Sequence, residues 1–371
     1  MSKPKVIAFY LPQYHPTPDN DKWWGKGFTE WTNVGKAKPL FRGHYQPKVP
    51  ADLGYYDLRL PEVREAQAEL AKEAGIYGFC YYHYWFAGKE ELELPFNEVL
   101  RLGKPDFPFM LCWANESWHQ KFWDKDGKGS SKELLIEQTY PGEEDHIAHF
   151  YRLLPAFKDP RYIQIDGKPV FMIYKPRLIP NVTELINLWN KLAKENSLKG
   201  LTFIAHCLTD EKDFINEEEE ITLMIDKGFS FININRIFNP VLKRTKLKKY
   251  LNKFSRLITR KPLVVSYKRA IKEFTNYNVD SLEYVIPTII PNWDHTPRSG
   301  INGLVYKDSS PFYFKKHLIS VISNIKEKDK NHNFVFLKSW NEWGEGNYIE
   351  PDLEFGKDYI ISLRNILETY E

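Results

Sequence analysis

The sequence predicts an α/β fold in which the whole chain, residues 1–371, forms a single (β/α)8 barrel with long loops. Eight short apolar segments alternate with helical patterns, which predicts parallel strands joined by crossover helices. The length of 371 residues suits one barrel. Polar and aromatic residues follow nearly every apolar segment, at the strand ends where barrels carry their active sites. An open doubly wound sheet is the second choice.

The predicted strands are short apolar runs rich in aromatic and β-branched residues. The first reads KVIAFYL and the second YGFCYYHY, whereas the sixth, TLMID, is the weakest. In order, the predicted strands cover residues 5–11, 77–84, 108–114, 169–174, 201–207, 222–226, 284–290 and 333–338.

Between these strands, apolar residues recur at the spacing of one helix face. The stretch 208–262 fits the alternation least, so we expect a basic, partly helical insertion there. No internal repeat or domain boundary interrupts the chain. In order, the predicted helices cover residues 61–74, 90–102, 143–157, 181–195, 245–258, 263–275, 311–328 and 356–369.

The composition is that of a globular chain with an unusual share of aromatic residues. Aromatics make up 15% of the residues and include eleven tryptophans. This share favours a cleft whose side chains stack on the rings of a ligand, and the alternative is simply an aromatic-rich core. Cys80, Cys112 and Cys207 all lie in apolar runs, so we expect buried thiols and no disulfide framework. The start of the chain shows no signal-peptide pattern, and no apolar run reaches transmembrane length. The default expectation is a cytoplasmic protein.

The charge is unevenly distributed although the net charge is only +3. From Lys227 to Lys272 there are fourteen Lys or Arg residues and no acid, so that stretch carries a strong positive charge. Its centre, 243–261, has the pattern of a basic amphipathic helix. Two interpretations stay open. The first is a docked helix with a solvated basic face, and the second is a peripheral contact with an anionic surface, either that of the inner membrane or that of an anionic polymer. Sequence-specific nucleic-acid binding is not expected, because the chain has no recognisable nucleic-acid-binding module.

Polar and aromatic side chains at the predicted strand ends form the candidate substrate-binding set. A sugar cleft needs hydroxyl-binding polar groups and flat rings, and each residue could equally be an interior packing residue. Glu30, in the tryptophan-rich loop GFTEWTNV, is a further candidate. The set comprises Tyr10, Gln13, His15, Trp31, His83, Tyr84, Trp113, Asn115, Glu116, Tyr174, His206, Trp293, Asp294, Arg298, Trp340, Asn341 and Trp343.

A pair of carboxylates, Glu342 and Glu345, provides the candidate catalytic groups. They follow the eighth strand and lie beside Trp340 and Trp343 in SWNEWGEGNYIEP. At this spacing their Cβ atoms lie roughly 5–6 Å apart, so each raises the pKa of the other. One protonated and one ionised carboxyl group is the set that glycoside cleavage uses. No metal-binding spacing, nucleophile elbow or phosphate loop is present, so we expect neither a metal nor another cofactor.

Several long motifs resemble those of the WbsX-like family, which is related to glycoside hydrolase family 99, the endo-α-mannosidases and endo-α-mannanases. The resemblance covers nearly the whole chain and is poorest over 208–262. The motifs are IAFYLPQYHP, GFTEWTNV, YGFCYYHYWF, CWANESW, DPRYIQIDGKPVFMIYKP, PNWDHTPR and SWNEWGEGNYIEP.

The resemblance implies a (β/α)8 barrel that retains anomeric configuration through a 1,2-anhydro sugar. It gives Glu342 the role of base for the substrate's 2-hydroxyl and Glu345 that of general acid and then base. The chain departs from family 99 at Gly344, where a histidine is usual, and at Asn347 and Tyr348, where Thr-Gln is usual. The sugar or its linkage is therefore expected to differ from that of the mannosidases.

The predicted function is a retaining glycoside hydrolase acting on an α-linked glycan. The first alternative is a glycosyltransferase of surface-polysaccharide biosynthesis (O-antigen, capsule or lipopolysaccharide), with Asp124 and Asp126 as a weak Asp-x-Asp signal. The second is a carbohydrate-binding barrel without catalysis, against which the retained carboxylate pair counts.

Overall fold

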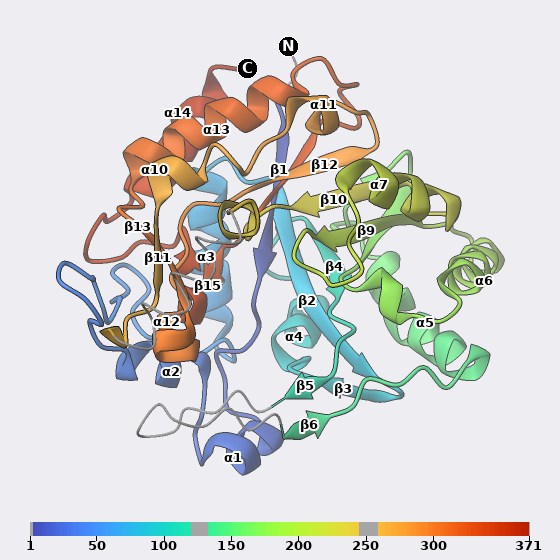
Figure 1. The fold of residues 1–371 in the computed structure, drawn as a ribbon. Helices are drawn as coiled ribbons and strands as arrows, with labels where there is room; N and C mark the ends of the chain where they lie inside the picture. The colour runs from blue at the N-terminus through green and yellow to red at the C-terminus, as the bar shows by residue number, and fades with distance from the viewer. Residues whose placement is uncertain (1–2, 120–132, 245–258, 371) are drawn as a thin grey trace.

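The computed structural model describes residues 3–119, 133–244 and 259–370, and within them the chain forms a closed (β/α)8 barrel (Figure 1). Neighbouring barrel strands pair in parallel and in chain order. The barrel closes where β1 pairs with both β14 and β2, in the registers Val6↔Val335 and Phe9↔Cys80. The barrel strands are β1 (Lys5–Tyr10), β2 (Gly78–Phe86), β4 (Phe109–Trp113), β8 (Lys168–Ile173), β9 (Thr202–Leu208), β10 (Phe231–Asn235), β12 (Val285–Ile289) and β14 (Phe334–Leu337).

Helices surround the strands and cover their outer faces. In α6 (Val182–Glu195), Val182, Leu185, Ile186 and Trp189 are buried at the spacing of one helix face, which explains why that segment packs on the sheet as a helix. The other main helices are α3 (Pro61–Glu73), α4 (Leu94–Leu102), α5 (Glu143–Phe157), α7 (Glu217–Asp226), α13 (Pro311–Ile325) and α14 (Asp358–Glu368).

The barrel interior is filled by side chains, as in other closed eight-stranded barrels. Phe9 stacks against Tyr82 and Phe336, with ring centroids 5.4 and 5.1 Å apart. His206 lies beside these rings and hydrogen-bonds Asn233 through Nδ1 at 2.6 Å. These side chains form the layer of the barrel interior directly beneath the strand-end residues, and we call this layer the barrel floor.

The sixth strand differs from the prediction. Residues 222–226 lie in α7, and the strand is β10, which begins at Phe231. Asn216 caps that helix by accepting from the Glu219 amide at 2.9 Å, and four glutamates occupy its first turn. Acidic residues stabilise a helix N-terminus, so this segment is helical despite its apolar run. The stretch 208–262 therefore contains two barrel elements.

The predicted helix 263–275 was also wrong at its start. It begins as the strand β11 (Leu263–Ser266), which pairs in parallel with β13 (Leu304–Lys307), and only then turns into α10 (Tyr267–Ala270). Val264 and Val265 favour the extended conformation at this point. The predicted helix 245–258 and the pair Asp124 and Asp126 lie outside the described residues.

Short elements gather at the carboxyl ends of the barrel strands, and α1, α2, α12, β3, β5 and β6 lie in the lower part of Figure 1. Several of them border the barrel mouth. Their bounds are α1 (Pro18–Trp24), α2 (Glu30–Lys36), β3 (Lys89–Glu91), β5 (Trp118–His119), β6 (Leu134–Ile136), η1 (Pro176–Leu178), α8 (Asn239–Leu242), α12 (Thr296–Ser299), η2 (Gly300–Asn302), β15 (Asn341–Glu342), η3 (Trp343–Glu345) and β16 (Asn347–Tyr348). Elsewhere, β7 (Gln164–Ile165) pairs with β8, and α11 (Tyr277–Asp280) precedes β12.

Across the described ranges, no helix has the length and apolar character needed to cross a membrane.

Candidate active site

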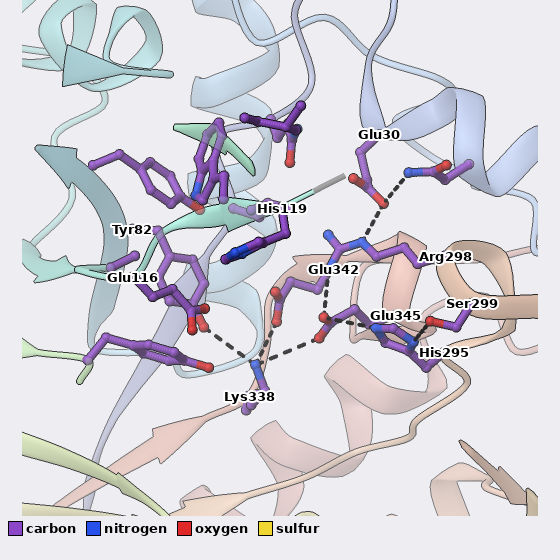
Figure 2. A pocket seen from close by; sticks show the side chains of 18 of the residues that line it. Glu30, Tyr82, Glu116, His119, His295, Arg298, Ser299, Lys338, Glu342 and Glu345 are labelled. Atoms are coloured by element: carbon purple, nitrogen blue, oxygen red, sulfur yellow. Dashed lines mark hydrogen bonds and ion pairs between the residues drawn. The ribbon is translucent and has the colours of Figure 1, made fainter. Parts of the chain in front are cut away.

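A cavity of about 650 Å³ opens at the carboxyl ends of the barrel strands. Its walls come from segments far apart in the sequence, which is typical of a barrel active site. Aromatic side chains line much of it, and a group of charged side chains lies together at one end (Figure 2). The aromatic residues are Trp24, Phe28, Trp118, Phe238 and Trp293, together with Tyr82, Tyr84 and Tyr174 from the strand ends.

Glu342 and Glu345 lie at the charged end of this cavity, next to Lys338 (Figure 2). The Lys338 ammonium nitrogen lies 2.9 Å from Glu342 Oε2 and 3.9 Å from Glu345 Oε2. It also donates to the Tyr82 hydroxyl at 3.4 Å. Lys338 is only 4% exposed, so this cation holds both carboxylates in a largely dry setting.

A second cation, Arg298 of α12, holds Glu345 from the opposite side. Its Nη1 lies 2.5 Å from Glu345 Oε1, and its Nε donates to Glu30 Oε1 at 2.8 Å. His295 Nε2 is 3.6 Å from the same Glu345 oxygen, and Ser299 Oγ contacts His295 Nδ1 at 2.7 Å. Three carboxylates therefore share two permanent cations, so one more proton would neutralise the cluster.

The two carboxylates have opposite pKa shifts. Burial raises the pKa of Glu342, and the nearby charge of Glu345 raises it further, against the effect of Lys338. Burial alone would also raise the pKa of Glu345, but Arg298, Lys338 and His295 outweigh it and hold that pKa well below its ordinary value. Of the two, Glu342 is therefore the carboxyl group that holds a proton more readily, and Glu345 is the one that stays ionised.

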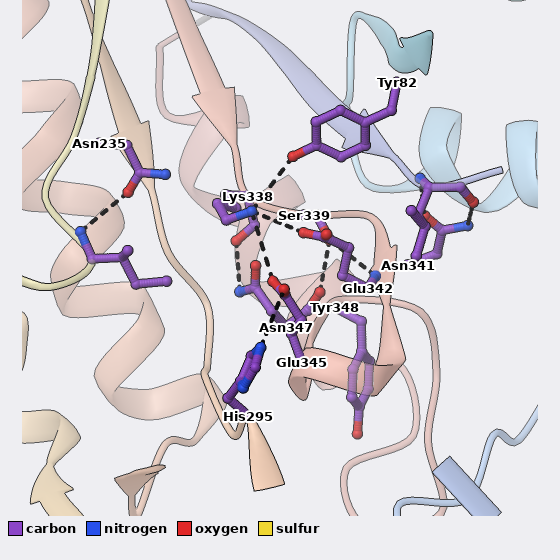
Figure 3. A network of polar contacts seen from close by, with 12 residues as sticks. Tyr82, Asn235, His295, Lys338, Ser339, Asn341, Glu342, Glu345, Asn347 and Tyr348 are labelled. Atoms are coloured by element: carbon purple, nitrogen blue, oxygen red, sulfur yellow. Dashed lines mark hydrogen bonds and ion pairs between the residues drawn. The ribbon is translucent and has the colours of Figure 1, made fainter. Parts of the chain in front are cut away.

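Polar contacts of the chain around Glu342 fix the geometry of the pair (Figure 3). Ser339 Oγ accepts from the Glu342 amide at 3.0 Å and donates to the Asn347 carbonyl at 2.7 Å. The Asn347 side-chain amide donates to the carbonyls of Lys338 and Asn292, at 2.8 and 2.7 Å. These contacts join the end of β14 to the short β15–β16 hairpin that carries Glu342.

Glu350 braces the back of the same turn. It accepts hydrogen bonds from Trp343 Nε1 at 2.6 Å, Gln67 Nε2 at 2.7 Å and the Tyr56 hydroxyl at 2.9 Å. Burial raises the pKa of Glu350 to about 7, although these donors oppose the shift. Trp343 is thus a structural member of the turn, stacked on Tyr348 at 3.7 Å.

The structure brings a subset of the predicted residues together around the cavity. Glu342 and Glu345 lie beside each other, and Arg298 contacts one of them. The predicted residues that line the cavity are Gln13, Glu30, Tyr84, Glu116, Tyr174, Trp293, Arg298, Glu342 and Glu345.

Several predicted residues point away from the cavity, because a barrel strand is buried on both faces. Tyr10 faces α3 and donates to Gln67 Oε1 at 2.6 Å. His83 faces α5 and contacts His149, Nε2 to Nε2, at 2.8 Å. Trp113 is fully buried and donates to the Trp85 carbonyl at 3.2 Å. None of these three lines the cavity.

Others hold the loops or the barrel floor and do not line the cavity. Asn115 bonds the backbone of Lys175, and Asn341 bonds both the amide and the carbonyl of Leu11. His206 lies one layer down, stacked on Tyr174 at 4.6 Å. The other predicted residues that do not line the cavity are His15, which is buried, Trp31, which donates to the Tyr56 carbonyl, Asp294, which accepts from Gln46 and Thr296, and Trp340 and Trp343, which are fully buried.

Lys338 and Tyr82 are site residues that the sequence-based reasoning missed. Both stand inside apolar runs and were interpreted as strand residues. A lysine at the end of an apolar strand, four residues before a glutamate, is the signal that could have identified Lys338. Asn20 and Asn33 also line the cavity, and each has a buried side-chain oxygen without a hydrogen-bond partner. Among the described residues, no group of three or more His, Cys, Asp or Glu is placed to hold a metal ion.

Comparisons with known proteins agree with this architecture. A family model described as "Glycosyltransferase WbsX" matches residues 6–363. Two curated relatives, both named "Uncharacterized protein WxcX" and from two strains of Xanthomonas campestris pv. campestris, are 34% identical over 370 residues. The match covers 98% of this chain and 49% of theirs, so the chain spans about half the length of these relatives.

Solved structures share the fold at low sequence identity. A "Glycoside hydrolase-like protein" aligns with a TM-score of 0.60 at 15% identity, over 98% of this chain and 94% of that one. The family 99 endo-α-mannosidase from Bacteroides thetaiotaomicron aligns with a TM-score of 0.57 at 15% identity, over 100% of this chain and 98% of that one.

Proposed function

This chain belongs to the WbsX glycosyltransferase family, and on that premise we propose that it is a carbohydrate-active enzyme that cleaves an α-linked glycan with retention of configuration. One observation carries the proposal. Two carboxylates, one buried and one largely buried, are bridged by a single ammonium group and differ in the direction of their pKa shifts. They lie at the end of a barrel cavity lined with aromatic rings. Such a pair supplies the acid and the base that glycoside cleavage needs.

The charges around the pair favour Glu342 as the acid. In the proposed reaction, the Glu342 carboxyl group gives its proton to the glycosidic oxygen while the bond between that oxygen and the anomeric carbon breaks. The Glu345 carboxylate takes the proton of the sugar's 2-hydroxyl, whose oxygen bonds to the anomeric carbon and forms a 1,2-anhydro sugar. Water then adds to the anomeric carbon while the bond between that carbon and the 2-oxygen breaks. The water gives one proton to Glu342 and keeps the other, and Glu345 returns to the 2-oxygen the proton that it took from the 2-hydroxyl.

This assignment reverses the roles that the resemblance to family 99 implies, where Glu342 would be the base and Glu345 the acid. An aryl glycoside whose leaving group needs no proton separates the two. A variant without the acid keeps the first-turnover release of the aryl group, although later turnovers slow because the same residue accepts the proton of water, whereas a variant without the base loses that release. We expect Glu342→Gln to keep it and Glu345→Gln to lose it; the opposite result would support the roles implied by the resemblance.

Aromatic side chains support a glycan as the substrate. Trp24, Phe28, Trp118, Phe238 and Trp293 line the cavity, and flat rings bind the apolar faces of sugars. The fold of the endo-α-mannosidase neighbour is consistent with an endo-acting enzyme, but the departures at Gly344, Asn347 and Tyr348 favour a different sugar. We infer a polysaccharide or oligosaccharide substrate with no cofactor.

A glycosyltransferase of surface-polysaccharide assembly is the second candidate, favoured by the description of the family. In that case the same intermediate is opened by a sugar hydroxyl instead of water, or a nucleotide sugar is the donor. Product analysis with glycan alone, glycan plus a sugar acceptor, and glycan plus nucleotide sugars separates these reactions. Product formation that requires a nucleotide sugar would contradict the hydrolase, and so would binding without any product.

The basic stretch 243–261 supports a further proposal, that the enzyme is cytoplasmic and makes a peripheral contact with an anionic membrane surface. Only its ends are described, where Lys243 pairs with Glu273 at 2.9 Å. Sedimentation with vesicles containing anionic lipid tests this contact. Binding that weakens with salt is expected, and equal recovery with neutral vesicles would contradict it.

A further inference from the structure

The backbone conformation of Gly344, which lies between Trp343 and Glu345, does not require a glycine. Its φ angle is not in the left-handed region, so any residue could adopt its conformation. A Cβ atom at this position would lie 1.7 Å from Oε1 of Glu30 and 2.7 Å from its Cδ. The carboxylate of Glu30 therefore occupies the space that a side chain at position 344 would fill.

Glu30 is firmly held in that space. It is 1% exposed and is the first residue of α2, and its backbone amide donates to the Gln13 carbonyl at 3.0 Å. Its Oε1 accepts from Arg298 Nε at 2.8 Å and from Asn33 Nδ2 at 3.2 Å. A side chain at position 344 could not be accommodated unless these contacts broke.

Arg298 carries the contact onward to the catalytic pair. One guanidinium group reaches Glu30 through Nε and Glu345 through Nη1, so the three side chains form a chain across α2, α12 and η3 (Figure 2). A planar guanidinium with fixed donor directions can hold two carboxylates at once, whereas a lysine ammonium holds them only as a point charge.

We propose that Gly344, Glu30 and Arg298 form one positioning unit that holds Glu345 in a fixed orientation as the ionised carboxylate of the pair. The unit acts through Glu345, and its role rests on the proposed function. It accounts for the glycine: Gly344 leaves room for Glu30, Glu30 orients Arg298, and Arg298 fixes Glu345. The lowered pKa of Glu345 agrees with this arrangement. An ordinary structural ion pair would affect folding stability without controlling the ionisation of Glu345.

Infrared spectroscopy of the carboxyl groups tests the unit without any substrate. Protonated and ionised carboxyl groups absorb at separate frequencies, so the spectrum of each variant at pH 7 shows whether a carboxyl group has gained a proton. Arg298→Lys and Gly344→Ala are expected to gain a protonated-carboxyl band relative to wild type. Because Glu345→Gln also lowers the pKa of Glu342, the band is assigned to Glu345 only if an added Glu345→Gln substitution removes it and an added Glu342→Gln substitution leaves it.

Gly35→Ala is the matched control, because Gly35 lies on α2, has no positive φ, and a Cβ there meets nothing within 4 Å. It should leave the spectrum unchanged. Thermal unfolding of each variant identifies any that fails to fold, and Arg298→Lys keeps the test available if Gly344→Ala is such a variant. If neither folded variant gains a band that Glu345→Gln removes, the proposal is overturned.

A double-mutant cycle gives a second readout on any substrate that the wild type cleaves. Gly344→Ala alone is expected to lower kcat about 100-fold with little change in KM, because a displaced catalytic group costs about that much. Once Glu30→Ala has emptied the space, adding Gly344→Ala should cost little more. If the loss of kcat in the double variant equals the product of the two single losses, the proposed positioning unit is contradicted. If the wild type cleaves nothing, the proposed function fails while the infrared result still decides the positioning unit.

Discussion

Lys338 is the single residue on which the proposed chemistry depends most after the two carboxylates. It lies within 4 Å of both and is almost fully buried. We expect Lys338→Met to lower kcat by about 100-fold or more, because two carboxylates would then face each other without the shared cation. Steady-state kinetics measures the loss. Lys328→Met is the matched control: Lys328 is also buried, but it donates to the Val285 carbonyl at the opposite end of the barrel. Equal activity of Lys338→Met and wild type would contradict the assignment.

Glu350 gives a prediction about stability and pH. Its pKa is about 7 in the folded chain against an ordinary 4.5, so between these values the folded state binds more protons than the unfolded state. The free energy of unfolding therefore falls as pH rises from about 4.5 to about 7, by about 3 kcal/mol from this group. Denaturant unfolding of wild type and Glu350→Gln across this range measures the difference. If the difference between the two does not change with pH, the assignment is wrong.

The Asn341 side chain helps to join the turn after β14 to the end of β1. Asn341 accepts from the Leu11 amide at 2.8 Å and donates to the Leu11 carbonyl at 3.1 Å, both buried. Asn341→Ala leaves both backbone groups unsatisfied and is expected to cost about 2–4 kcal/mol of unfolding free energy. Asn341→Asp keeps the oxygen that accepts from the Leu11 amide, but it replaces the donating amide nitrogen with a second oxygen. That oxygen would face the Leu11 carbonyl oxygen, so this variant should also be less stable. Denaturant titration measures both, and a change below about 0.5 kcal/mol in either would contradict this role.

At the level of elements, the sequence predicted most barrel strands, and its failures have physical reasons. Apolar runs alternating with helical patterns were sufficient for β1, β2, β4, β8, β9, β12 and β14. The run at 222–226 was mistaken for a strand because it is short and apolar. It is helical because Ile221 and Met224 are buried at helical spacing behind a capped, acidic first turn. β10, read as FININ, carries Asn233 and Asn235 inside the barrel, and that polar content obscured it.

Across the whole molecule, the order of the strands was predictable but the direction of their side chains was not. Both faces of a barrel strand are buried, so periodicity does not distinguish the interior from the helix-facing side. Tyr10 and Tyr82 look alike in the sequence, yet Tyr10 contacts α3 and Tyr82 lines the cavity. Glu342 and Glu345 were found because they follow the last strand, where position alone brings side chains to the barrel mouth.

The proposal that this molecule cleaves glycosidic bonds is tested most directly by product formation from a panel of α-linked bacterial glycans and mannans, with no nucleotide sugar added. New reducing ends from the wild type, and none from Glu345→Gln, are the predicted result. Gly35→Ala should match the wild type, because the added Cβ atom meets no other atom within 4 Å. Reducing ends formed equally by Glu345→Gln, or products that form only when a nucleotide sugar is supplied, would contradict the account.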